Sequence, residues 1–148
     1  MTSDLQALYR DVVIDHNRHP RNFRALEAGR TAEGFNPLCG DRLTVFVRVE
    51  TGSIQDVSFQ GLGCAIATAS ASLMTESVKG KTVAEAAALF ERVQRMLTAS
   101  SDAPIDDLGA LSALAGVRRF PVRMKCATLA WYALRAAAAT ADEVVSTE

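Results

Sequence analysis

The stretch Arg42–Glu50, RLTVFVRVE, alternates apolar and polar side chains along its length. Apolar residues occupy every second position from Leu43 to Val49, and alternate side chains of a β-strand point to the same face. The sequence TGS at 51–53 then offers a turn, and apolar residues resume between Ile54 and Phe59. This pattern predicts a β-hairpin with one buried face.

A third strand is expected around residues 30–35, where it can pair with the first strand of the hairpin. Elsewhere apolar residues recur at helical spacing, and residues 82–85 (TVAE) have the form of a capping box at a helix start. Helices are predicted at about residues 5–17, 65–74, 83–98, 108–115 and 122–142. The sequence therefore predicts an α+β fold in which several helices cover a small three-stranded antiparallel sheet.

The composition is that of an ordinary globular domain. The chain has 148 residues, of which 49% are hydrophobic and 22% are charged, and its formal net charge is −1. This balance gives no support to nucleic-acid binding. The N-terminus has no apolar signal, and no stretch reaches the roughly 18–20 apolar residues of a membrane helix. We therefore expect one cytoplasmic domain over residues 1–148, with no nucleic-acid or membrane partner.

Three cysteines, Cys39, Cys64 and Cys126, are spread along the chain without any Cys-x-x-Cys pair. Their odd number and wide spacing indicate neither a disulfide framework nor an ordinary zinc finger. Cys64 comes directly before a predicted helix, where unpaired N–H groups and the helix dipole favour a thiolate. Spacing alone leaves two interpretations open: inert buried thiols, or ligands of one shared metal site.

Residues 36–41, NPLCGD, carry a thiol and a carboxylate two positions apart, between the first two predicted strands. Pro37 restricts the backbone and Gly40 permits angles that a side chain would forbid, so we expect a stiff turn. In an extended chain Cys39 and Asp41 would point the same way and could reach one metal ion together. The alternative is that Cys39 is a small buried side chain and that Asp41 only forms the turn.

Two histidines, His16 and His19, lie near the end of the first predicted helix. Their residue type would suit a metal ion. However, the carbonyl end of a helix attracts positively charged side chains, and this role needs no metal. We therefore interpret both histidines as helix-terminus cations rather than as ligands.

Four stretches of the chain match the pattern of one known family. They are the opening from Leu8-Tyr9 to Pro20-Arg21-Asn22, the turn NPLCGD at 36–41, FQGLGCAI at 59–66 with the Ala/Ser run after it, and RMKCA at 123–127. With these motifs, and over nearly its whole length, the chain resembles the SufU type within the IscU and NifU N-terminal-domain family of iron–sulfur cluster assembly proteins. The resemblance implies the α+β fold of that family, the SufE/NifU type.

Two departures from IscU-like scaffolds match the SufU type. Lys125 stands where those scaffolds carry a histidine, and the interval between Cys64 and Cys126 is expanded by a segment that includes residues 100–118. The resemblance implies a zinc-dependent sulfurtransferase, a persulfide carrier that accepts sulfur from a SufS-type, pyridoxal-phosphate-dependent cysteine desulfurase and stimulates it. The sulfur would pass on to a SufBCD-type cluster assembly complex. The alternative is an IscU-like scaffold on which a [2Fe–2S] cluster is assembled, and Lys125 in place of histidine counts against it.

By the same resemblance, the metal ligands would be Cys39, Asp41, Cys64 and Cys126. Zinc suits a tetrahedral site of thiolates with one oxygen, and it does not change oxidation state. Three thiolates, one carboxylate and Zn²⁺ sum formally to about −2, which calls for nearby cations. Arg123 and Lys125 could supply them, although a solvated role on the helix surface remains open for both. We expect Cys39 to be the sulfur acceptor, because it lies in a turn rather than at a helix end.

Overall fold

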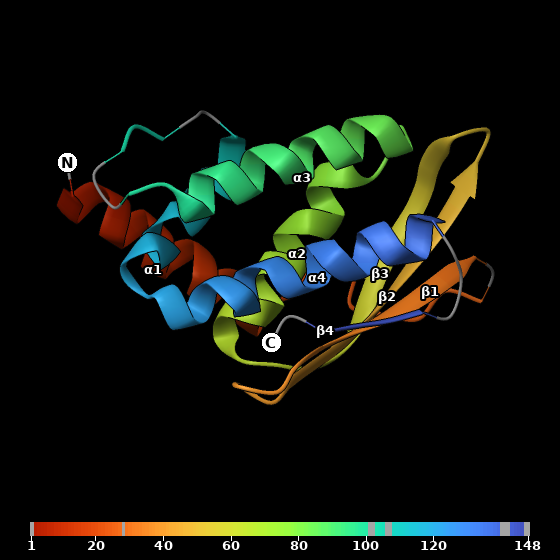
Figure 1. Cartoon of the computed structure of the whole chain (residues 1–148), viewed down its shortest axis with the longest axis horizontal. Helices are drawn as coiled ribbons and strands as arrows, with labels where there is room; N and C mark the ends of the chain where they lie inside the picture. The colour runs from red at the N-terminus through yellow and green to blue at the C-terminus, as the bar shows by residue number, and fades with distance from the viewer. Residues whose placement is uncertain (1, 28, 101–102, 106–107, 140–142, 147–148) are drawn as a thin grey trace.

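The computed structural model describes residues 2–27, 29–100, 103–105, 108–139 and 143–146 (Figure 1). In chain order its elements are α1 (Thr2–Arg18), β1 (Arg30–Asn36), β2 (Asp41–Glu50), β3 (Ser53–Leu62), α2 (Ala65–Val78), α3 (Val83–Thr98), the 3₁₀ helix η1 (Gly109–Arg119), α4 (Pro121–Ala139) and β4 (Glu143–Ser146). The predicted α+β fold is confirmed. Part of the expanded interval, residues 101–102 and 106–107, lies outside the described residues.

The sheet has the strand order β3-β2-β1-β4. The three predicted strands pair antiparallel, as expected, and β4 adds a parallel neighbour to β1. No strand was predicted at β4. The last helix was expected to reach residue 142; the structure gives α4 as far as Ala139, and residues 140–142 lie outside the described residues. The alanine run at the end of α4 favours a helix, and β4 has only four residues, too few for a periodic pattern.

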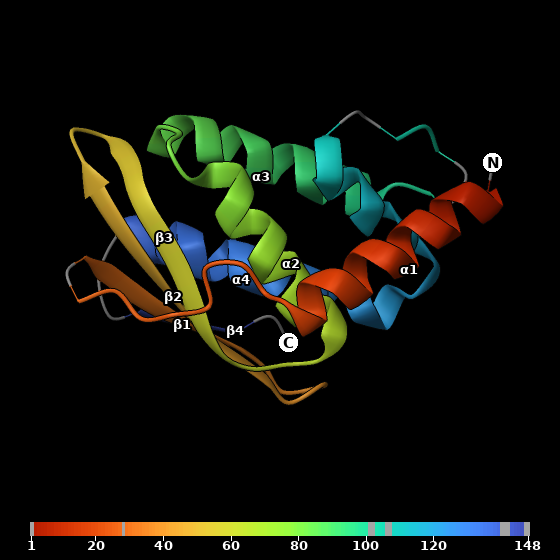
Figure 2. The same ribbon diagram turned by 180° about the vertical axis from the view of Figure 1, so that it is seen from behind.

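The alternation that predicts β2 corresponds to one buried face. Leu43, Val45 and Val47 are fully buried, and Val45 lies opposite Phe59 of β3. In Figures 1 and 2 the helices lie together on one side of the sheet, so this face is covered by helices. Trp131 of α4 is also fully buried. The apolar core therefore sits between the sheet and the helices.

A glycine in β1 lets α4 approach the sheet closely. A Cβ atom added at Gly34 would lie 2.9 Å from Cδ1 of Leu129, which is tighter than ordinary packing allows. Cys126 lies three residues before Leu129 on the same helix. Because residues three apart share a helix face, the contact at Gly34 also brings Cys126 toward the β1 side of α4.

The helices α1 and η1 lie away from the β2–β3 turn, at the other end of the molecule (Figure 2). A Cβ atom at Gly116 of η1 would overlap the ring of Tyr9 in α1, so the absence of a side chain there permits this contact. The capping box predicted at Thr82 and Glu85 is present at the start of α3. Within the described residues, no helix combines the length and apolar character that a membrane crossing needs.

Candidate metal centre

The NPLCGD segment forms the connection between β1 and β2. Asn36 ends β1, Asp41 begins β2, and these two residues are the last pair of that ladder. The N–H of Gly40 donates to the carbonyl oxygen of Asn36 at 2.8 Å and closes the turn. Gly40 has φ +72°, in the left-handed region that glycine tolerates at little cost. The expected turn is present, with Cys39 half-buried and Asp41 fully buried.

The structure brings Cys126 of α4 to this turn. The Sγ atoms of Cys126 and Cys39 are 3.2 Å apart, although the two residues are 87 positions apart in the sequence. One ligand atom each from Cys39, Asp41 and Cys126 lies within 4.8 Å of the other two, and such a group could hold a metal ion. Two thiolates bound to zinc at about 2.3 Å in tetrahedral geometry lie roughly 3.8 Å apart. The thiols are therefore within about half an ångström of the separation that zinc requires.

Cys64 lies at the edge of this group rather than within it. It is the N-cap residue of α2, as the sequence predicts, and its backbone N–H donates to Oδ1 of Asp41 at 2.8 Å. Its Sγ atom is 4.0 Å from Oδ2 of Asp41. Among the described residues, the compact group contains only the other three side chains. A fourth bond from Cys64 to a metal ion would thus need a movement of its side chain, and its role as a ligand stays a prediction.

The thiol of Cys126 is more deeply buried than the thiol of Cys39. Cys126 is fully buried, and its burial, followed by its hydrogen bond with Cys39 and the nearby Asp41, raises the pKa of its thiol. A metal-free Cys126 is therefore protonated at neutral pH. A metal ligand must be a thiolate, so metal binding at this group would release a proton from Cys126.

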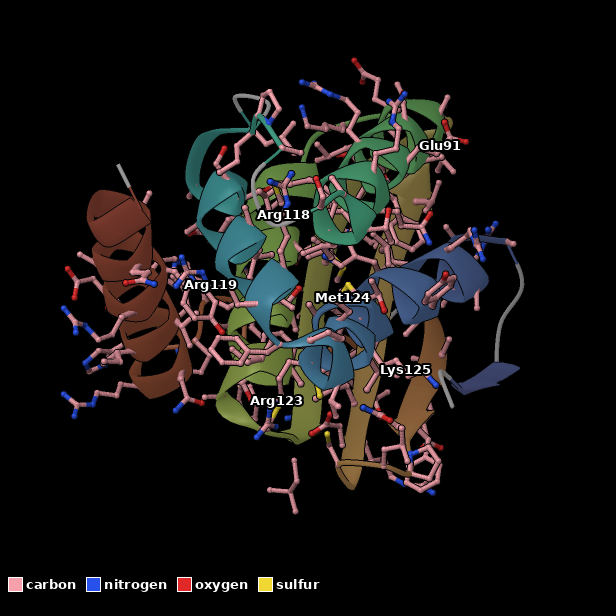
Figure 3. The ribbon with its side chains drawn as sticks, turned by 60° about the vertical axis from the view of Figure 1, so that its left-hand side comes forward. Glu91, Arg118, Arg119, Arg123, Met124 and Lys125 are labelled. Carbon is pink, nitrogen blue, oxygen red and sulfur yellow. The ribbon has the colours of Figure 1, made fainter. Side chains whose placement is uncertain are left out.

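Arg123 and Lys125, the two cations proposed near the site, extend in different directions. Nη1 of Arg123 is 3.9 Å from Sγ of Cys39, and the arginine is exposed. In Figure 3 Arg123 extends beside the sulfur atoms, whereas Lys125 extends from the other side of α4. Residues two apart on a helix are separated by about 200° around its axis, which accounts for this divergence. The geometry supports a role beside the thiols for Arg123 and gives Lys125 no contact with them.

Two residues have roles that the sequence analysis did not predict. From the sequence Asn36 is only the first residue of the NPLCGD turn, yet its side chain is fully buried and donates to Cys126 Sγ at 3.4 Å. His16, interpreted as a helix-terminus cation, is buried, and its Nδ1 lies 2.7 Å from Oγ of Ser72. Burial lowers the pKa of His16, so the interpretation as a cation is wrong for His16. His19 is exposed.

An exposed apolar surface borders Cys39. A surface hollow is lined by Cys39, Leu38 from the turn and residues 119–123, which run from the end of η1 into α4. Leu38 is 66% exposed, Val122 64% and Phe120 50%, and Arg119 and Arg123 add positive charge to the same hollow. Large exposed apolar side chains that gather at one place are typical of a protein-binding surface. A partner that binds here would contact Cys39 directly.

Known proteins resemble this chain in sequence and in structure. The family model of the NifU-like N-terminal domain matches residues 8–144. A zinc-dependent sulfurtransferase SufU from Bacillus subtilis is 39% identical over 89% of this chain and 90% of its own length. An iron–sulfur cluster assembly scaffold protein IscU from Streptococcus pyogenes is 41% identical, with coverages of 91% and 85%. A solved structure described as a scaffold protein for the SUF system, from Fervidobacterium islandicum, is 30% identical with a TM-score of 0.81, covering 90% of this chain and 98% of its own.

Proposed function

Because the chain belongs to the NifU-like N-terminal domain family, we propose that it is a zinc-dependent sulfurtransferase of iron–sulfur cluster assembly. The observation that carries this proposal is the group of Cys39, Asp41 and Cys126, with Cys39 open to a surface hollow. A thiol that is both at a metal site and accessible suits sulfur transfer, because exchange requires an accessible thiolate. The similarity to a SufU sulfurtransferase supports the same reaction.

We propose that Cys39, Asp41, Cys64 and Cys126 hold the zinc ion. The donor set of soft sulfur with one carboxylate oxygen fits zinc. Zinc, when bound, keeps thiolates deprotonated at neutral pH without any redox chemistry of its own. Asp41 is the hard donor of this set, so its bond is the weakest by chemical type.

Cys39 is the proposed sulfur acceptor. It is half-buried beside the hollow, whereas Cys126 is fully buried and out of a partner's reach. In the transfer, the Cys39 thiolate attacks the outer sulfur of the desulfurase persulfide. The sulfur–sulfur bond of that persulfide breaks, and the desulfurase cysteine leaves as a thiolate. Cys39 becomes the persulfide, so no external oxidant or reductant is needed.

Arg123 would assist this step through its charge. Its guanidinium lies 3.9 Å from the Cys39 sulfur, and a cation at that distance stabilises the negative charge of the sulfur atoms during the transfer. Because Arg123 is exposed, it can also turn toward an incoming partner. We do not extend this role to Lys125, since Lys125 lies on the other side of the helix (Figure 3).

The proposed partners follow from the same surface. A SufS-type, pyridoxal-phosphate-dependent cysteine desulfurase would dock over the hollow beside Cys39, where Leu38, Phe120 and Val122 offer apolar contacts. The sulfur would then pass to a SufBCD-type assembly complex. Three free cysteines and a persulfide require reducing surroundings, so we expect the reaction in the cytoplasm, with residues 1–148 acting as one domain.

A cluster scaffold is the second candidate. It is favoured by the 41% identity to an IscU scaffold protein, which is as high as the 39% identity to the SufU sulfurtransferase. The same cysteines could ligate a [2Fe–2S] cluster, since thiolates suit iron–sulfur clusters as well as zinc. Lys125, in place of the histidine expected in such scaffolds, argues against this candidate.

Metal analysis of the purified protein, followed by a desulfurase assay, distinguishes the two. We expect about one zinc ion per chain, no visible chromophore, and a higher rate of cysteine turnover when the zinc-loaded protein is added to a SufS-type desulfurase. Arg123→Ala should stimulate less than the parent, because it removes the cation beside Cys39. Arg92→Ala, a change on an exposed residue of α3, is its matched control and should stimulate normally. Bound iron with inorganic sulfide, and no stimulation by zinc-loaded protein, would favour the scaffold instead.

A further inference from the structure

Asn36 has an orientation fixed at both ends of its amide group. It is fully buried at the end of β1, and its Oδ1 accepts a hydrogen bond from the N–H of Leu38 at 3.3 Å. Because the oxygen faces this backbone donor, the NH₂ end faces the interior of the site. Nδ2 lies 3.3 Å from Oδ2 of Asp41 and 3.4 Å from Sγ of Cys126. One amide therefore joins a turn to two candidate ligand atoms.

The two ligand atoms that Asn36 contacts come from different parts of the fold. Asp41 begins β2, whereas Cys126 belongs to α4, 90 positions after Asn36. Each of the two N–H bonds of the amide can serve one of them. Donors to ligand atoms fix the orientation of those atoms and stabilise their anionic form. The Asn36 amide can thus set the separation of Asp41 and Cys126 before a metal ion arrives.

The two ends of the site are stabilised by different groups. Arg123 lies beside Cys39 at the exposed end, where water reduces the cost of its charge. At the buried end an uncompensated cation would be expensive, and a neutral amide can donate hydrogen bonds without that cost. Asn36 occupies this position, with 0% of its surface exposed.

We propose that Asn36 is a positioning residue of the metal site, which holds Asp41 and Cys126 in metal-binding geometry through its NH₂ group. This inference rests on the proposed zinc site. A purely structural role would require only the hydrogen bond from Leu38 N–H to Oδ1, which supports the turn beside the backbone bond from Gly40. The hydrogen bonds of Nδ2 to the two ligands are not needed for that turn.

Two substitutions separate these roles. Asn36→Asp keeps the shape and the acceptor for Leu38 N–H, but it replaces the NH₂ donors by an anion next to Asp41 and Cys126. Asn36→Ser also keeps an acceptor for the turn, adds no charge and is too short to reach both ligands. Asn22→Asp is the matched control, because Asn22 Nδ2 donates to Oγ1 of Thr75 at 3.0 Å, in a hydrogen bond that includes none of the site residues.

The experiment measures the zinc dissociation constant by competition with a chromophoric chelator, and the absorption spectrum of the cobalt-substituted protein. We expect Asn36→Asp and Asn36→Ser to weaken zinc binding by about 10–100-fold, the former more, and to shift the cobalt bands because the ligand geometry changes. Asn22→Asp should retain the affinity and spectrum of the parent. Should Asn36→Asp fail to fold, Asn36→Ser provides the measurement.

Parent-like zinc affinity and cobalt spectra in both Asn36 variants would overturn the role of Asn36 while leaving the proposed function intact. A parent protein that binds neither zinc nor cobalt would overturn the metal site itself, and this inference with it. A loss of affinity in Asn22→Asp equal to that in Asn36→Asp would show that any added carboxylate has the effect, and would overturn the specific role of Asn36.

Discussion

Asp41→Ala is expected to destabilise the metal-free protein in addition to weakening its metal site. The Asp41 carboxylate is fully buried and accepts hydrogen bonds at Oδ1 from the backbone N–H of Cys64 (2.8 Å) and at Oδ2 from Nδ2 of Asn36 (3.3 Å), with a longer one at Oδ2 from Sγ of Cys64 (4.0 Å). Removal of the carboxylate leaves the Asn36 amide and the Cys64 N–H and thiol without this acceptor. Asp41 is thus a structural link between β2 and the start of α2 as well as a candidate ligand.

The expected loss follows from the cost of an unsatisfied buried donor, about 1–3 kcal/mol. The fully buried Asn36 amide incurs this cost, while the half-buried Cys64 N–H can bond to water and adds less. For a chain of this size, each kcal/mol lowers the melting temperature by about 2–4 °C, so Asp41→Ala should melt about 2–12 °C below the parent. The measurement is thermal unfolding followed by far-ultraviolet circular dichroism, with chelator present throughout.

Asp15→Ala serves as the control, because Asp15 is a half-exposed carboxylate whose ion pair with Arg21 lies on the surface. A surface pair contributes about 0–1 kcal/mol, so this variant should melt within a few degrees of the parent. With zinc present, Asp41→Ala should also release the metal more readily, and Cys39 should be alkylated faster. A metal-free Asp41→Ala protein with the parent's melting temperature would refute the structural role of the carboxylate, and equal alkylation rates with zinc retained would refute its role as a ligand.

Three further outcomes are expected. Removal of zinc by a chelator should lower the melting temperature while the helical circular dichroism persists at room temperature, because most of the apolar core between the sheet and the helices needs no metal to pack; a random-coil spectrum would contradict this. The pKa of His16 is lowered by burial, so the unfolded chain binds its proton more readily, and the free energy of unfolding should decrease as the pH falls below about 6.5. His16→Gln should flatten this dependence and the exposed His19→Gln should not; identical pH profiles in both variants would contradict the assignment. Gly116→Ala should destabilise the protein by about 1–3 kcal/mol, because the added methyl group overlaps the Tyr9 ring, and an unchanged melting temperature would show that α1 adjusts freely.

Local sequence patterns predict the parts of this fold whose cause is local. The alternation in β2 and the capping box of α3 each lie within a few neighbouring residues, and the structure has both elements at the predicted places. The strand β4 could not be predicted in this way, since its pairing partner β1 lies more than 100 positions earlier in the chain. The burial of His16 likewise depends on Ser72, which is 56 positions away.

At the candidate site, too, the sequence predicts the local geometry but not the contacts between distant residues. The turn geometry of Cys39 and Asp41 follows from Pro37 and Gly40, which lie in the same six-residue stretch. That Cys126 meets them depends on the packing of α4 against Gly34, and spacing alone left its thiol as a possible inert core residue. The family motifs predict Cys39, Asp41, Cys64 and Cys126 as metal ligands. The structure brings Cys39, Asp41 and Cys126 together, and the binding of a metal by these residues stays a prediction. The motifs did not indicate the buried amide of Asn36, because its side-chain contacts arise only in the folded chain.

The position of the transferred sulfur shows whether Cys39 is the acceptor. The zinc-loaded protein is incubated with a SufS-type desulfurase, pyridoxal phosphate and cysteine, and its peptides are then mapped by mass spectrometry. We expect one additional sulfur atom on the peptide that contains Cys39, none on fully buried Cys126, and no stimulation of the desulfurase by a folded Cys39→Ser variant. Additional sulfur on Cys64 or Cys126 instead, or normal stimulation by Cys39→Ser, would contradict the assignment of Cys39 as the acceptor.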